Sequence, residues 1–271
     1  MKRDTCKMCH LQKDLLLSHL IPSALYKLCG NGDMDPIRVG DGFIIPTSRQ
    51  TRDHLLCREC EDVLNEGGEK WVNPKLCTME RVFPLYDLIV AGPPAWIEGN
   101  KAIYYASQNP QIEVGKLTHF ALGIFWKASV HSWRGGKIEP LIELGRYSNA
   151  IRLWLRGEAP FPRNVSLWVD VAPPDRALVT LNPPVQSSKK GWKTFLMHVP
   201  GLMFFMNVGA TMDAEALETC FYQNPSHPII VSPELAGVWE HHLAKHYRES
   251  TKTTAYFKAK ARRSKSKAPP P

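Results

Sequence analysis

The 271-residue chain has no apolar run that approaches the roughly 18 residues needed to cross a bilayer. Its first residues, MKRDTCKMCHLQKD, also lack the apolar core of a signal peptide. These two absences predict a soluble, cytoplasmic protein in a reducing compartment, without a membrane partner.

Several motifs of nucleotide-binding proteins and proteases are missing as well. No P-loop or complete G-x-G-x-x-G occurs, and Gly30 and Gly32 in CGNGD predict only a turn. His242 and His246 have the spacing of a metalloprotease helix, but Leu243 stands where that motif needs Glu. The sequence therefore does not support a P-loop protein, a dinucleotide-binding protein or a metalloprotease with this helical motif.

Acidic residues are absent from Lys252 onward, a segment that holds seven Lys or Arg. Of the net charge of +8, only about +1 (8 − 7) therefore belongs to the first 251 residues. The tail over 251–271 is poor in apolar residues and ends in three prolines, which predicts disorder. Its cations could neutralise DNA phosphates, a solubilising terminus being the alternative. The candidates for that contact are Lys258, Lys260, Arg262, Arg263 and Lys265.

Four of the seven cysteines form two C-x2-C pairs, Cys6 with Cys9 and Cys57 with Cys60. Four thiolates suit a closed, tetrahedral zinc site, which is structural rather than catalytic. Buried or disulfide-bonded cysteines are the weaker alternative, since nothing marks the chain as secreted. The other three are expected to be buried thiols: Cys29, Cys77 and Cys220.

Between and after the two pairs, the pattern predicts short elements. An apolar run over 15–21 predicts a strand that ends at Pro22, followed by a short helix over 23–26. A loop is expected over 29–42, and GFIIP over 42–46 predicts the second strand of the module. A helix opens at about Arg58, with a break or bend expected at Gly67 and Gly68.

The rest of the chain predicts a mixed α+β fold. Apolar residues at helical spacing predict a long core helix over 113–133, with Lys127 on another face. A second helix is expected from Ser148, as N-cap, to Gly157. KAIYYAS (101–107) is a possible strand, and four later runs predict a small antiparallel sheet: SLWVDV, ALVTL, WKTFLMHV and LMFFMNV. A last helix is predicted over 232–247.

These elements suggest four parts. Residues 1–80 form a zinc-binding module, 81–112 a connecting segment, 113–250 a mixed α+β accessory domain and 251–271 the basic tail. The accessory domain is expected to select the target, a protein partner or a second copy of the chain.

The pentapeptide SHLIP (18–22) between the cysteine pairs, with LLCRECEDVLN (55–65) after it, resembles the bacterial HNH-like (ββα-metal) endonucleases that carry a four-cysteine zinc site. The resemblance covers residues 6–71 and implies a zinc-stapled ββα-metal module. It implies that His19 is the general base for attack on a DNA phosphodiester, with Mg2+ or Mn2+ as catalytic cofactor. The usual Asp before that His is Ser18 here, a poorer ligand for a hard cation.

The remaining metal ligands belong on the helix after the second cysteine pair. Glu61 and Asn65 are four residues apart and share a helical face, and Glu69 continues that face if the glycines do not break the helix. His54 and Asp53 are further candidates, because many HNH modules carry their middle Asn nearby. The alternatives are a solvated helix face and, for His19, a hydrogen-bonded core residue.

The sequence thus predicts an HNH-type endonuclease that hydrolyses DNA, as in defence or mobile-element biology. The alternatives are a non-catalytic zinc module that recognises nucleic acid or a protein partner, and a nuclease subunit that a partner activates.

Overall fold

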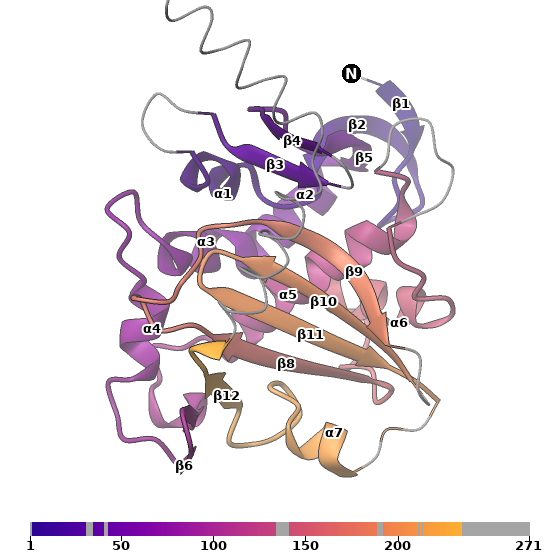
Figure 1. Cartoon of the computed structure of the whole chain (residues 1–271). Helices are drawn as coiled ribbons and strands as arrows, with labels where there is room; N and C mark the ends of the chain where they lie inside the picture. Colours follow the sequence, from indigo (N-terminus) through magenta and orange to yellow (C-terminus); the bar gives the residue numbers. More distant parts are fainter. Residues whose placement is uncertain are drawn as a thin grey trace, which may run out of the picture.

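The computed structural model describes residues 2–30, 35–40, 43–133, 141–188, 192–210, 212 and 214–234. Here the chain is mixed α+β, with a small N-terminal sheet beside four clustered cysteines and a larger mixed sheet (Figure 1). The helix predicted over 232–247 lies outside the described residues after position 234, and the basic tail lies wholly outside them.

Three antiparallel strands make the small sheet, in the order β1 (Lys2–Thr5), β2 (Gln12–His19) and β5 (Arg52–Cys57). β2 confirms the strand expected before Pro22, although it begins earlier and ends at His19. The helix expected after Pro22 is present as α1 (Ser23–Leu28).

The strand predicted from GFIIP is present as β4 (Phe43–Pro46), but its partner is β3 (Ile37–Gly40) in a separate two-stranded sheet. The prediction that it is the module's second strand is therefore wrong, and the loop predicted over 29–42 contains a strand. β5 takes that place beside β2. Its sequence, RDHLLC, starts with exposed polar residues and continues with consecutive buried ones, so it lacks the alternation that marks a half-buried strand.

One helical run follows β5, made of α2 (Arg58–Leu64), the π-helical turn η1 (Asn65–Glu69) and α3 (Lys70–Leu76). Where the sequence predicted a break or bend, at Gly67 and Gly68, the helix widens instead. A Cβ on Gly68 would lie 2.6 Å from backbone atoms of Lys116 and Phe120 on α5 (Val114–Val130). The glycine is therefore needed for the close approach of the two helices.

The larger sheet has seven strands, all antiparallel to their neighbours except for the parallel pair β12–β8. It is thus larger than the small antiparallel sheet that was predicted, and residues from 96–105 contribute two of its strands. The order is β6 (Trp96–Glu98), β7 (Lys101–Tyr105), β12 (Pro228–Val231), β8 (Val165–Val171), β11 (Leu202–Val208), β10 (Lys193–Val199) and β9 (Asn182–Ser188).

Three of the four predicted runs in this region are strands, but ALVTL (177–181) is not. In that run the carbonyl of Leu178 instead accepts a hydrogen bond from the Gly201 N–H, at 3.2 Å. The strand is the next segment, β9, at one edge of the sheet. The free edge of β9 accommodates one of the consecutive residues Pro183 and Pro184, because N–H groups on that side need no ladder partner. The other lies in the irregular stretch where the register with β10 shifts.

Two helices lie behind the larger sheet in Figure 1, α5 and α6 (Tyr147–Leu155). α5 confirms the predicted core helix, ending at Val130. α6 begins at Tyr147 with Arg146 at the N-cap, so the prediction of Ser148 as N-cap is wrong. The hydroxyl of Ser148 instead lies 3.3 Å from the hydroxyl of Ser129 on α5. Gly157 follows α6 with φ +69°, as predicted for its end. The remaining short helices are α4 (Pro84–Ile89), the 3-10 turn η2 (Ala106–Gln108) and α7 (Ala214–Glu218).

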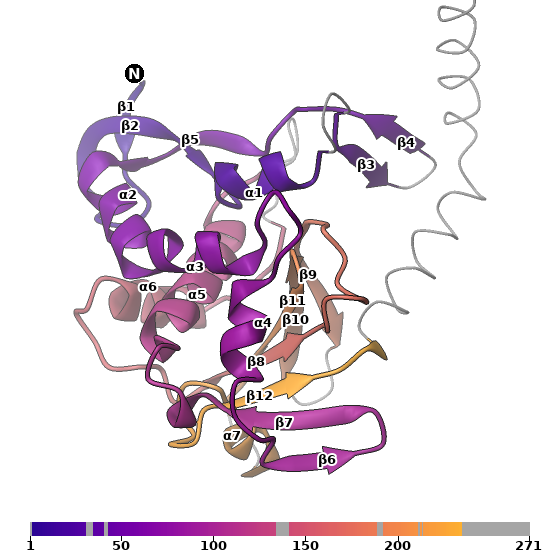
Figure 2. The ribbon, with the colours of Figure 1, turned by 90° about the vertical axis from the view of Figure 1, so that its left-hand side faces the viewer.

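A large buried apolar core extends through the three-stranded and the seven-stranded sheet, from Cys6 to Val231. α5 lies beside α3 and α6 (Figure 2), and it also packs on η1. Phe120 of α5 contacts Phe204 of β11, with ring centroids 6.2 Å apart. The small N-terminal sheet and the larger sheet are therefore connected through this helix. None of the helices in the described part of the chain is long and apolar enough to cross a membrane.

Candidate metal centre and adjoining polar cluster

The first cysteine pair lies in the turn between β1 and β2. The Cys6 N–H donates to the carbonyl of Leu11 (2.9 Å), and the His10 N–H donates to that of Cys6 (2.9 Å). His10 takes a left-handed conformation, with φ +61°, which closes the turn. Both thiols are therefore held on one short, hydrogen-bonded loop.

The second pair sits at the junction of β5 and α2. Cys57 is the last residue of the strand, opposite Leu15 of β2, and Cys60 lies in the first turn of the helix. The Lys7 N–H donates to the carbonyl of Leu55 at 3.2 Å, which ties the first turn to β5. Strand pairing thus brings together two motifs that are about fifty residues apart.

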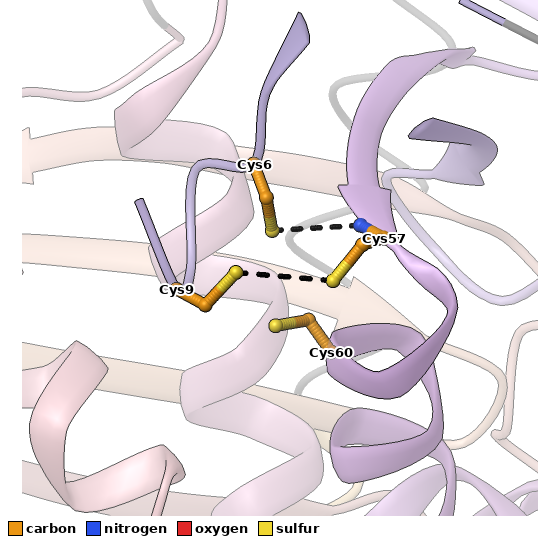
Figure 3. A group of neighbouring side chains, drawn as sticks. All are labelled: Cys6, Cys9, Cys57 and Cys60. Carbon is orange, nitrogen blue, oxygen red and sulfur yellow. Dashed lines mark hydrogen bonds between the residues drawn. The ribbon is translucent and has the colours of Figure 1, made fainter. Parts of the chain in front are cut away.

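The four sulfur atoms all lie within 4.8 Å of one another (Figure 3). Cys9 Sγ and Cys57 Sγ are 3.8 Å apart, whereas a disulfide needs about 2.05 Å. In a tetrahedral site with Zn–S bonds of about 2.3 Å, the sulfur atoms are about 3.8 Å apart. All four thiols are free, and the Cys57 N–H donates to Cys6 Sγ at 3.4 Å. The cluster is therefore consistent with a structural zinc site.

The thiols of Cys6, Cys57 and Cys60 differ in their pKa values. A hydrogen bond with Cys60 lowers the pKa of Cys6 to about 4, and the same contact raises the pKa of Cys60. Burial raises the pKa of Cys57 to about 11. A thiolate forms readily at one position, as the first step of metal binding requires.

Arg152 of α6 and Arg156, the residue that follows this helix, reach the first cysteine turn. Arg152 Nη1 donates to the carbonyl of Met8 at 2.7 Å, and Arg156 Nη1 donates to the same oxygen at 3.3 Å. Zn2+ with four thiolates would carry a net charge of about −2. These guanidinium groups would place positive charge close to that negative site and so stabilise it. The accessory part of the chain thus supports the cysteine turn directly.

A second group of polar side chains lies between β2, the helical run and α5, and we call it the polar cluster. Its members come from four elements and all are buried or half-buried. They are Ser18, His19, Glu61, Glu69 and Lys127.

Lys127 is the centre of the polar cluster, with its side chain only 2% exposed. Its Nζ donates to the carbonyl of His19 at 2.8 Å and pairs with Glu69 Oε1 at 3.2 Å. The helical pattern predicted Lys127 on another face than the core, and this is wrong, because α5 is enclosed between the module and the sheet and is buried on almost every side. A single Lys inside the apolar run ALGIFWKASV was the available signal.

Ser18 is committed to protein contacts. Its Oγ accepts a hydrogen bond from the Leu56 N–H at 3.2 Å, and its hydroxyl bonds the carboxylate of Glu61. Burial raises the pKa of Glu61, opposed by the nearby charge of Lys127 and by the Ser18 contact. Ser18 therefore holds Glu61 against β2.

His19 and Glu61 each keep one buried polar atom without a partner among the described residues, Nε2 and Oε1 respectively. Burial lowers the pKa of His19, and the positive charges of Arg52 and Lys127 act in the same direction, whereas the Gln50 side chain and the charge of Glu69 oppose this shift. The imidazole is therefore neutral at neutral pH, with a nitrogen free to accept a proton. Buried, unpaired polar atoms are rare and call for a water, an ion or a reactant.

The other predicted site residues have other surroundings. Asn65 is exposed, whereas Glu61 is half-buried. Asp53 pairs with His131 Nε2 at 3.0 Å near the surface, and His54 Nδ1 lies 3.1 Å from the carbonyl of Leu15. Glu69 does continue inward from Glu61, as the wider turn of η1 allows.

Comparisons with family models, with curated proteins and with solved structures found no match for this chain.

Proposed function

We propose that β2, β5 and α2 form an HNH-like module that hydrolyses DNA phosphodiester bonds, with His19 as general base. Cys6, Cys9, Cys57 and Cys60 would bind a structural zinc that fixes the end of β5 and the start of α2 against β2. Support comes from the order strand, strand, helix beside the cysteine cluster.

One observation carries the proposal. His19 Nε2 is buried and has no partner among the described residues, and the lowered pKa keeps the ring neutral. A neutral imidazole in this position can take the proton of an attacking water. A histidine with a purely structural role would be expected to have its buried nitrogens hydrogen-bonded.

The residue that pairs with His19 across the sheet is of a type that binds phosphate groups. Arg52 pairs with His19 in the antiparallel register of β5 and β2, and it is exposed. Cross-strand partners share one face of a sheet, so a guanidinium group lies on the face of the imidazole. The basic tail, with Lys258, Lys260, Arg262, Arg263 and Lys265, would add contacts to DNA that weaken with salt.

The catalytic Mg2+ or Mn2+ implied by the resemblance is a poorer fit. Hard cations need several oxygen ligands, with carboxylates among them. Ser18 is engaged by Leu56 and Glu61, Asn65 is exposed, and Glu69 is paired with Lys127. We therefore assign no step of hydrolysis to a divalent cation.

The test is cleavage of supercoiled plasmid and of single-stranded DNA by the full chain, compared with His19→Ala at matched zinc content. We expect the substitution to lower the rate by about 100-fold or more, the usual contribution of a general base. The control is His227→Asn, because His227 precedes β12 far from the module and Asn tolerates its left-handed φ of +52°. Equal cleavage by wild type and His19→Ala would reject His19 as the base.

The buried ion pair of Lys127 favours a second candidate, a non-catalytic zinc module that recognises nucleic acid or a protein partner. In such a module the polar cluster would only hold β2, η1 and α5 together. The chain would then bind DNA without cutting it. Salt-dependent DNA binding without cleavage, unchanged in His19→Ala, would support this candidate. A nuclease subunit that a partner or a second copy activates through residues 113–250 is the other alternative, and it would also be inactive alone.

A further inference from the structure

The position of Lys127 has a consequence for the metal content of the chain. Its Nζ lies between the carbonyl of His19, at the end of β2, and the carboxylate of Glu69, at the end of η1. Its charge also reaches Glu61 on α2. The Lys127 ammonium group is thus surrounded by oxygen atoms that could otherwise coordinate a metal cation.

The other donors near it are already in use. Ser18 Oγ is bonded to Leu56 and Glu61, and one oxygen of Glu69 is taken by Lys127. In the described ranges, the four cysteines are the one group of three or more His, Cys, Asp or Glu side chains whose ligand atoms converge. The buried atoms of the polar cluster that keep no partner among the described residues are Glu61 Oε1 and His19 Nε2, one carboxylate oxygen and one imidazole nitrogen.

The Lys127 side chain is held in this position by its burial and by the surrounding helix. Its side chain is 2% exposed, and its own backbone carbonyl accepts a hydrogen bond from Trp133 Nε1 at 2.8 Å. A divalent ion among these oxygens would face a fixed positive charge a few ångströms away in a water-poor site, where repulsion is poorly screened.

We propose that the Lys127 ammonium takes the place of a divalent cation in the polar cluster, so that the chain binds zinc at its cysteines and no Mg2+ or Mn2+ at His19 and Glu61. Lys127 is then a positioning residue, which orients the end of β2 through the carbonyl of His19. The consequence for hydrolysis rests on the proposed function, whereas the occupancy of the site does not. If the module cuts DNA, added divalent cations should not be required.

The test is a titration of the full-length, zinc-loaded chain with Mn2+, followed by the electron paramagnetic resonance signal of the free ion. Three proteins are compared: wild type, Lys127→Arg, which keeps the charge, and Lys127→Met, which removes it at similar length. We expect no binding to the first two below about 1 mM, the weak end for protein oxygen sites. Lys127→Met should bind one ion at least about 10-fold more tightly, and a further Glu69→Gln substitution should remove that binding.

Tight binding of one Mn2+ to the wild type, abolished by Glu61→Gln or Glu69→Gln, would overturn the proposal. So would a folded Lys127→Met protein that gains no Mn2+ binding. If Lys127→Met does not fold, the wild-type titration with these Glu variants decides alone. Failure of the proposed hydrolase would appear as absent DNA cleavage, a different measurement from Mn2+ occupancy.

Discussion

Asp170 is a half-buried acid on β8, and its Oδ1 atom is buried without a partner within the described part of the chain. Burial raises its pKa to about 7 from the ordinary 3.8, although the charge of Lys101 opposes this. The folded state therefore binds the proton more tightly than the unfolded state. The stability linked to this proton is fully present below about pH 4 and is lost as the pH rises through about 7.

We expect Asp170→Asn to remove this pH dependence, because the amide stays neutral. The variant should match the wild type near pH 4 and exceed its free energy of unfolding by about 4 kcal/mol at most near pH 8. Urea unfolding of both proteins across this range measures the difference. Asp175→Asn is the control, since the Asp175 side chain is 76% exposed. A difference between Asp170→Asn and wild type that stays constant with pH would contradict the assignment.

At the scale of elements, the contact of η1 with α5 reverses the usual effect of a glycine in a helix. Replacing a helical Gly by Ala ordinarily stabilises by about 1 kcal/mol. A Cβ on Gly68 would instead meet backbone atoms of Lys116 and Phe120 at 2.6 Å, and backbone atoms cannot rotate away. We expect Gly68→Ala to destabilise the protein by about 1–3 kcal/mol, measured by urea unfolding.

Gly115→Ala, in the first turn of α5, provides the matched comparison. A Cβ there has no heavy atom within 4 Å, so only the helix propensity acts and a small gain in stability is expected. If Gly68→Ala were as stable as Gly115→Ala, the close approach of η1 and α5 would be refuted.

The sequence predicted those elements whose signal is local. The C-x2-C pairs, α1 after Pro22, the core helix α5 and the runs that became β8, β10 and β11 all follow from short-range patterns. β5 was missed because its polar and buried residues form two separate halves and do not alternate. β9 was missed because its prolines argue against a strand, although an edge strand can contain them. The partners of β12 are β7 and β8, which lie far from it in the sequence, and periodicity does not encode such contacts.

The polar cluster shows the same limit for the candidate site. His19 was predicted from the resemblance carried by SHLIP, and Glu61 from its helical spacing to Asn65 after the second cysteine pair. The part played by Lys127 was not, since it lies 108 residues after His19 and meets it only because α5 packs against the module. Its burial follows from the whole fold rather than from its neighbours in the sequence.

At the scale of the whole molecule, α6 connects the accessory part of the chain to the cysteine cluster. The link consists of hydrogen bonds from Arg152 and Arg156 to the carbonyl of Met8, between Cys6 and Cys9. Groups that orient metal ligands from outside typically change metal affinity by about 10–100-fold when removed. Zinc retention should therefore depend on a helix that contributes no ligand to the proposed site.

We expect Arg152→Ala to weaken zinc binding by about 10-fold or more, because the first cysteine turn loses its 2.7 Å hydrogen bond and nearby positive charge. Competition with a chromophoric chelator measures this directly. Arg146→Ala is the control at the N-cap of the same helix, since its guanidinium contacts Tyr147 rather than the cysteine turn. Equal zinc affinity in the two variants would show that the cysteine turn holds its metal without α6. A loss confined to Arg152→Ala would mean that the module does not keep its zinc independently of the rest of the chain, as the continuous core through α5 also implies.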